Sequence, residues 1–89
     1  MYLHLGQDTV VRTQDLIGIF DLDNTTISKH TKDFLKQAQQ EDRIVSVSYE
    51  LPKSFIVCKE AGREMIYLSQ LSSGTLQKRF DQQFVKNEL

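Results

Sequence analysis

"SFIVCKEAGREMIYL", residues 54–68, places a short polar segment between two apolar runs. Ser54 to Lys59 and Met65 to Leu68 are rich in the β-branched and aromatic residues that favour strands. The segment between them, Glu-Ala-Gly-Arg-Glu, has the composition of a turn. A connection this short joins antiparallel strands, because a parallel pair needs a crossover of a dozen or more residues. The stretch therefore predicts an antiparallel hairpin.

The same pattern of short apolar runs extends outward on both sides of this hairpin. Turn-forming segments separate the runs, such as Gly6-Gln7-Asp8 near the start and Glu50-Leu51-Pro52-Lys53 just before the hairpin. The predicted strands cover residues 2–5, 9–12, 16–20, 44–49, 54–59 and 65–68. Because short connections join consecutive strands, we expect antiparallel pairs, and we expect the last three strands to form a meander.

Two amphipathic helices complete the pattern. The apolar side of the first consists of Ile27, Thr31, Phe34, Leu35 and Ala38. This helix should begin within residues 25–28, with Thr25 or Thr26 as its N-cap, and end near Gln40. The second should begin at the capping segment Ser72-Ser73-Gly74-Thr75, after which Leu76, Phe80 and Phe84 recur every four residues.

Length and composition fit one small domain. A chain of 89 residues buries only about 60–65% of its unfolded surface, so it is marginal alone and gains from association. We expect residues 1–89 to form a single α+β domain. Its small, mostly antiparallel sheet should have about six short strands, with two helices in the order β-β-β-α-β-β-β-α.

The single cysteine and the absence of targeting features indicate a cytoplasmic protein. Cys58 lies in the apolar run Phe55-Ile56-Val57-Cys58, which predicts a buried thiol rather than a nucleophile. The first residues, Met1 to Gly6, show none of the features of a signal peptide. No apolar run approaches the length of a membrane span, so we expect no membrane contact.

"IGIFDLDNTTI", residues 17–27, looks like the first motif of haloacid-dehalogenase-type phosphatases. In that interpretation Asp21 would attack phosphorus and Asp23 would serve as acid and base beside a magnesium ion. Such a fold needs repeated βαβ units of ~30 residues, whereas one helix here lies between strands. We therefore favour a strand that ends in a polar turn and a helix cap. With His4 and His30 isolated, the sequence predicts no enzyme, no metal site and no cofactor.

Three lysines form a stripe on the predicted first helix. Lys29, Lys32 and Lys36 fall opposite the apolar side, at spacings of three and four residues. Since 11 Lys+Arg and 12 Asp+Glu give a net charge of −1, a polyanion must meet a local patch. The stripe is either a contact for the phosphate backbone of double-stranded DNA or a solvated helix face. Lys53 and Arg12 would extend the patch if the fold brings them to the same side.

Unpaired sheet edges favour self-association. Six short strands with no closing pattern leave edges rich in Val, Ile and Tyr on a marginal domain. A head-to-tail interface that closes produces a ring, and repetition of a weak patch around a ring raises avidity without new contacts. We therefore expect a homo-oligomer, and a closed ring if the interface is head-to-tail.

Four stretches together resemble the RemA/RemB family of extracellular matrix regulatory proteins. They are "MYLHLGQDTVV", "IGIFDLDNTT", "ELPKSFIV" and "IYLSQLSSGTLQKR", and the likeness covers residues 1 to about 80. The resemblance implies a small ring-forming regulator of biofilm-matrix genes that wraps DNA. In such a ring, basic residues around the rim would contact the phosphates.

The chain departs from the RemA branch at the turn before the central hairpin. That branch carries Gly-Arg-Arg-Thr-Arg where this chain has Glu50-Leu51-Pro52-Lys53-Ser54, which leaves Lys53 as the one cation of the turn. A RemA arginine before the third strand aligns near Asp15, with Arg12 the closest cation. A basic pair at the start of the RemA helix matches Lys32-Asp33.

Two functional hypotheses follow. The first is a ring-forming, DNA-binding transcriptional regulator that uses Arg12, Lys29, Lys32, Lys36 and Lys53. The alternative is an oligomeric scaffold that binds a protein partner, such as its paralogue, without DNA. The near-neutral charge and the loss of the Arg-rich turn motivate the second.

Overall fold

The computed structural model describes residues 1–22 and 27–85 and has the predicted order of strands and helices. In chain order, the elements are β1 (Tyr2–Gly6), β2 (Thr9–Arg12), the 3-10 helix η1 (Thr13–Asp15), β3 (Leu16–Asp21), α1 (Lys29–Gln40), β4 (Ile44–Ser46), β5 (Ser54–Glu60), β6 (Arg63–Ser69) and α2 (Ser73–Val85). The α+β class is confirmed. The strands form two sheets: a β1-β2 hairpin and a four-stranded sheet in the order β3-β5-β6-β4.

The β5–β6 hairpin predicted from residues 54–68 is confirmed. The two strands are antiparallel, and their register extends from Ser54 opposite Ser69 to Glu60 opposite Arg63. The loop is therefore reduced to two residues, Ala61 and Gly62, both with positive φ (51° and 80°). Two positive φ values at the centre of a two-residue loop are characteristic of the type I′ turn, whose twist matches that of the flanking strands.

The predicted meander is wrong at β4. This strand lies at the edge of the sheet and pairs in parallel with β6, from Ile44 opposite Ile66 to Ser46 opposite Leu68. The segment between β3 and β4 contains α1 and is long enough for the crossover that joins parallel strands. The β5–β6 hairpin then fills the space between them, so the sheet is mixed rather than wholly antiparallel.

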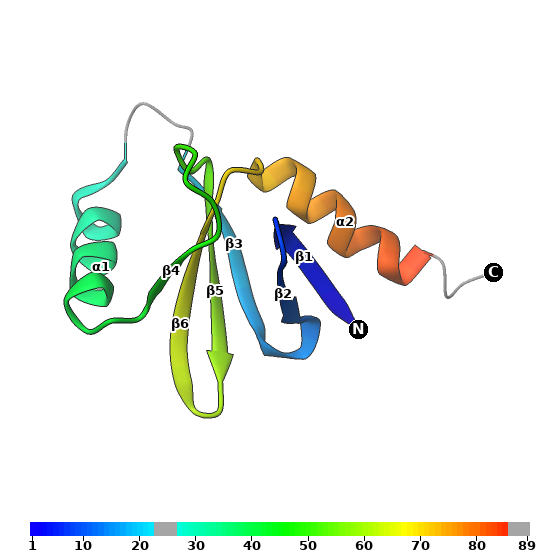
Figure 1. The fold of residues 1–89 in the computed structure, drawn as a ribbon, viewed down its shortest axis with the longest axis horizontal. Helices are drawn as coiled ribbons and strands as arrows, with labels where there is room; N and C mark the ends of the chain where they lie inside the picture. Colours follow the sequence, from blue (N-terminus) through cyan, green and yellow to red (C-terminus); the bar gives the residue numbers. More distant parts are fainter. Residues whose placement is uncertain (23–26, 86–89) are drawn as a thin grey trace.

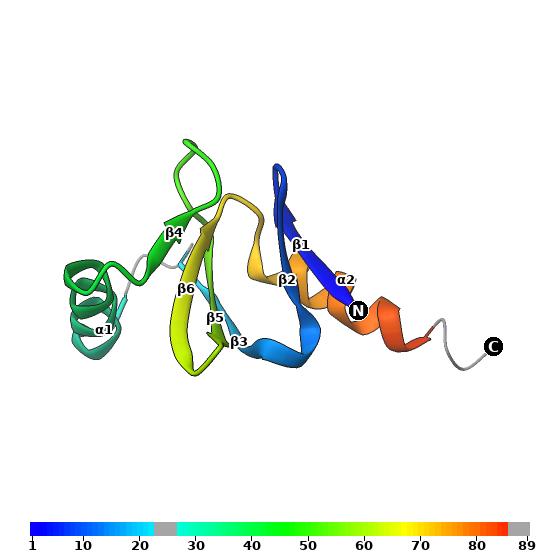
Figure 2. The ribbon, with the colours of Figure 1, turned by 60° about the horizontal axis from the view of Figure 1, so that its bottom comes forward.

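Three layers are stacked in the molecule: α1, the four-stranded sheet, and a layer made of the β1-β2 hairpin and α2 (Figures 1 and 2). Side chains of β5 alternate between the layers, as expected for a strand covered on both faces. Phe55 and Val57 pack with Ala38 of α1 on one face. Ile56 and Cys58 pack in the opposite core, with side chains from β1, β2 and α2.

Both helices begin at a serine N-cap. The Ser28 side chain accepts a hydrogen bond from the backbone N–H of Thr31 (3.1 Å), so it caps α1. The predicted caps Thr25 and Thr26 lie outside the described residues. Ser72 caps α2 in the same way, accepting from the Thr75 N–H at 3.1 Å, as its sequence predicts. A cap of this kind contributes about 1 kcal/mol to helix stability.

Candidate nucleic-acid interface

The three lysines of α1 lie on its exposed side. Lys29, Lys32 and Lys36 are all solvent-exposed, while Phe34, Leu35 and Ala38 pack against the sheet. Helix α1 therefore has the charged side and the apolar side that its helical spacing predicts. Among residues 1–22 and 27–85, no ion pair or hydrogen bond engages these three ammonium groups. They form an exposed row of cations along α1.

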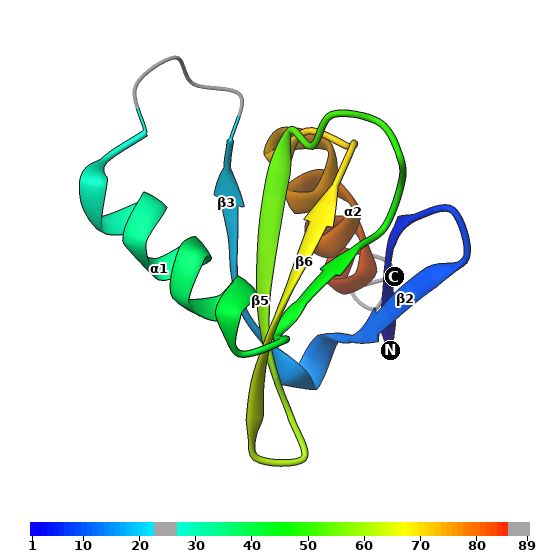
Figure 3. The same ribbon diagram turned by 60° about the vertical axis from the view of Figure 1, so that its left-hand side comes forward.

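Lys53 lies at the end of the sheet where β3 stops and β5 starts. Its backbone N–H donates to Ser69 O, and its carbonyl accepts from the Leu22 N–H, both at 2.8 Å. These bonds fix its main chain between the end of β6 and the end of β3, and its side chain remains exposed. In Figure 3 the first turn of α1, which begins at Lys29, lies towards this same end of the sheet.

Arg12 is held at the opposite end. It precedes η1, whereas Lys53 lies beside the residue that follows β3. A six-residue strand such as β3 spans roughly 17–20 Å at ~3.3 Å per residue. The guanidinium also makes a two-point contact with Asp15, with Nε–Oδ2 at 2.9 Å and Nη2–Oδ1 at 3.2 Å. This hydrogen bond, with the nearby negative charge, raises the pKa of Arg12 and compensates much of its field.

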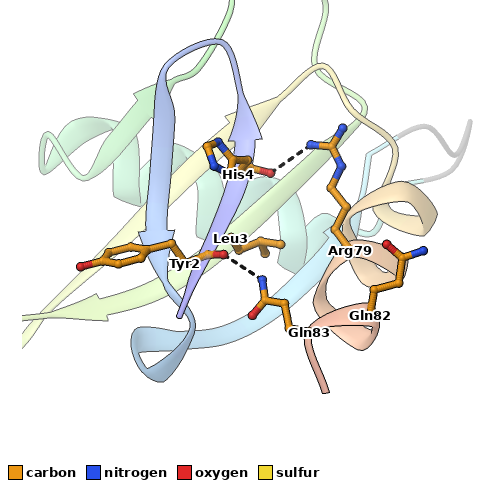
Figure 4. A pocket seen from close by; sticks show the side chains of 6 residues that line it. All are labelled: Tyr2, Leu3, His4, Arg79, Gln82 and Gln83. Atoms are coloured by element: carbon orange, nitrogen blue, oxygen red, sulfur yellow. Dashed lines mark hydrogen bonds between the residues drawn. The ribbon is translucent and has the colours of Figure 1, made fainter. Parts of the chain in front are cut away.

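A hollow lies between β1 and α2, where the α2 side chains reach the strand backbone (Figure 4). Gln83 Nε2 donates to Tyr2 O at 2.8 Å, and Arg79 Nη1 donates to His4 O at 3.4 Å. Tyr2 and His4 are two residues apart, so their carbonyls point to the same side of β1. The two donors therefore cover the outer edge of the hairpin, which is the usual protection of an edge strand.

Sequence reasoning did not identify an apolar groove between β3 and α1. The groove has a volume of about 360 Å³, and its lining includes Ile17, Phe20, His30, Phe34, Phe55 and Glu64. Ile17 and Phe20 are 56% and 44% exposed. Their apolar character was visible in the sequence, but the uncovered position was not, because it depends on how far α1 reaches across the sheet.

The described part of the chain was expected to hold no metal site, and its candidate ligands are dispersed. It contains no group of three or more His, Cys, Asp or Glu side chains able to hold a metal ion. Cys58 is fully buried, and burial, followed by the charges of Glu60 and Asp15, raises its thiol pKa to about 12. The predicted inert thiol is confirmed. Asp21 ends β3, and Asp23, the other carboxylate of the phosphatase-like motif, lies outside the described residues.

The helices are short. Neither α1 nor α2, as described, has the length and apolar composition needed to cross a membrane.

These observations define a small α+β domain whose candidate functional groups are exposed cations. Residues 2–80 match the family described as extracellular matrix regulatory protein A-like (RemA-like), and the chain belongs to this family. It is similar to extracellular matrix regulatory protein B of Bacillus subtilis (strain 168), with 43% identity over 79 residues, 89% of each chain. The family resemblance expected from four sequence segments is confirmed.

Proposed function

We propose that this chain is the subunit of a homo-oligomeric, ring-shaped transcriptional regulator that binds double-stranded DNA through its phosphate backbone. The observation that carries the proposal is the stripe of exposed lysines on α1, Lys29, Lys32 and Lys36, which form no ion pair with any of the described residues. Lys53 lies towards the same end of the sheet and adds a fourth cation. Four cations per subunit, repeated around an assembly, give the avidity that one net-negative subunit lacks.

The proposed contact is electrostatic and independent of base sequence. Lysine ammonium groups neutralise phosphates and release counterions, so affinity falls steeply as salt rises. Arg12 plays a lesser part in this proposal, because Asp15 already holds its guanidinium at the other end of β3. The regulated genes would be those of the extracellular matrix, in keeping with the family to which the chain belongs.

A mobility-shift titration tests the proposal. Wild-type protein should retard a duplex that carries a matrix-gene promoter at 50 mM salt and lose about 10³-fold or more in affinity by 200 mM. Lys32→Glu and Lys53→Glu should each weaken binding about tenfold or more at low salt and reduce the salt slope by about 0.9 per lost phosphate contact. Lys78→Glu, the same charge change on exposed α2, is the matched control and should bind like wild type.

Unchanged retardation by the Lys32 and Lys53 variants would mean that other residues contact the DNA. An oligomer that retards no duplex even at low salt would favour the second candidate, a scaffold for a protein partner. The contact between Arg12 and Asp15 favours that alternative, since it compensates one of the five proposed cations. Pull-down of the paralogue by such an oligomer would support it directly.

A further inference from the structure

The groove between β3 and α1 has the size of a small-molecule site. Its volume of about 360 Å³ exceeds the 280 Å³ or so of the hollow between β1 and α2. It lies within the range of about 300–1,000 Å³ that is typical of ligand pockets. Side chains from β3, α1, β5 and β6 converge on it. The groove takes no part in the proposed DNA contact, so its occupant is a separate question.

The floor of the groove is aromatic. Phe20 stacks on Phe55 with ring centroids 4.9 Å apart, and the Phe34 ring centroid lies 6.4 Å from that of Phe55. A Cβ added to Gly18 would come within 2.7 Å of the Phe20 ring, so this glycine lets the ring lie close against the strand. Phe20 nevertheless remains 44% exposed. A ligand with an apolar body, above all an aromatic ring, would cover this surface and gain the free energy of its burial.

One carboxylate gives the groove its charge. Glu64 is the formally charged side chain in the lining, and it is 42% exposed. Arg43 contacts Glu64 Oε1 through Nη1 at 3.2 Å, but its Nε also donates to Glu41 Oε1 at 2.7 Å. The guanidinium is therefore shared between two carboxylates. One positive and two negative groups leave this cluster with a net negative charge, which favours a cation in the groove.

Glu64 can accept a further donor. Arg43 bonds one of its oxygens, so among the described residues the other, Oε2, is available to a second N–H group. Lys59 lies opposite Glu64 in the β5–β6 register, yet these two residues form no ion pair in the described part of the chain. A carboxylate accepts strong charge-assisted hydrogen bonds from an ammonium group, and the faces of nearby aromatic rings also attract cations. An anionic ligand would be repelled by the same carboxylate.

We propose that the groove between β3 and α1 binds a small organic cation, with its apolar body on the aromatic floor and its ammonium group at Glu64. The occupant is a free small molecule, since the hollow of about 360 Å³ is bounded by side chains from four elements. The imidazole of His30 on the α1 wall can form a hydrogen bond with a further polar group of the ligand. This inference is independent of DNA binding and of self-association.

Three probes of similar shape test the proposal. Phenethylammonium, 2-phenylethanol and 3-phenylpropionate share a phenyl ring on a short chain and end in a positive, a neutral and a negative group. Titrated into ¹⁵N-labelled protein and followed by NMR, phenethylammonium should shift the amide signals of Ile17, Phe20 and His30 to saturation. Its Kd should be on the order of 1 mM, as expected for so small a ligand. The alcohol should bind about tenfold more weakly, and the carboxylate more weakly still.

Two groove variants locate the site. Glu64→Gln should remove the preference for the ammonium over the alcohol, whereas Glu50→Gln, the same change at an exposed carboxylate between β4 and β5, should retain it. Ile17→Trp enlarges a groove side chain that is 56% exposed, so it should fill the groove and abolish binding of every probe. The NMR spectrum of each variant reports whether it is folded.

The inference is wrong if phenethylammonium does not saturate wild-type protein, or if 3-phenylpropionate binds as tightly as the ammonium does. It is also wrong if folded Glu64→Gln keeps the full preference for the ammonium. If Glu64→Gln does not fold, Ile17→Trp decides, because wild-type affinity in this variant would place the bound probe elsewhere. None of these results depends on whether the protein retards DNA.

Discussion

At the scale of single residues, position in the fold decides which side chains remain chemically available. Cys58 and Tyr67 face the same core, and burial is the largest cause of the raised pKa of each. The Tyr67 hydroxyl also donates to Glu60 at 2.7 Å, which further raises its pKa. The exposed lysines have no such partner among the described residues. Their charges are available for binding, whereas the thiol and the phenol are kept neutral.

The buried thiol predicts a loss of stability in alkali. Above pH ~8.5 the unfolded chain releases the Cys58 proton, whereas the folded chain keeps it until its pKa of about 12. The thiol's contribution is therefore complete below pH ~8.5 and is lost as the pH rises towards 12. The free energy of unfolding should fall by up to about 1.4 kcal/mol per pH unit in this window from this group.

Denaturant titrations at pH 8 and pH 10.5 check the alkaline prediction. Cys58→Ala should flatten the pH dependence, although a small cavity lowers its stability at both values. If Cys58→Ala lost as much stability between the two pH values as wild type does, groups other than Cys58 would be responsible for the loss. Native Cys58 should also resist alkylation at pH 8, because it is fully buried.

At the scale of elements, the sequence predicts what is local and misses what is not. The β5–β6 hairpin and α1 follow from short turns and helical spacing, which are encoded within a few residues of one another. The partner of β4 is not encoded in this way. The short apolar run of β4 fits a parallel or an antiparallel neighbour equally well. This three-residue strand pairs with β6 at the edge of the sheet because α1 connects it across the sheet to β3.

The same limit applies to the candidate site. The helical spacing places Lys29, Lys32 and Lys36 on one side of α1, as the structure has them. Sequence reasoning missed the contact of Arg12 with Asp15, although these residues are only three apart across η1, and the distance of Arg12 from Lys53 depends on the course of β3. The groove beside β3 was missed for a similar reason, since it is formed by side chains from four separate elements.

The type I′ turn of the β5–β6 hairpin gives a prediction at this scale. Ala61 has a φ of 51°, which strains an L-residue with a Cβ, and asparagine tolerates this region better. Ala61→Asn should therefore raise the free energy of unfolding by about 0.5–1 kcal/mol. Gly62→Ala should lower it by ~1 kcal/mol through backbone strain alone, since a Cβ there has no neighbour within 4 Å.

Thermal and denaturant unfolding of the two turn variants provide the check. Gly74→Ala, an exposed glycine within α2, serves as a control because helix propensity predicts that alanine stabilises it by up to about 1 kcal/mol. If Gly62→Ala were neutral while Gly74→Ala behaved as expected, the turn would not have the described geometry.

At the scale of the whole molecule, the proposed function requires a small chain of net charge −1 to join copies of itself and to bind a polyanion. The three-layer subunit places its lysine stripe on α1, while α2 covers the outer edge of the β1-β2 hairpin. This leaves the two edges of the four-stranded sheet for association. Assembly would multiply the lysines without changing the subunit, so that oligomerisation and DNA binding depend on each other.

Sedimentation velocity of the purified protein, alone and with a fluorescent duplex at 50 mM salt, tests the central claim most directly. The account predicts a single oligomer several times heavier than the 10.3 kDa subunit, which carries the duplex with it and releases it at high salt. A 10.3 kDa monomer that leaves the duplex behind at every salt concentration would contradict it.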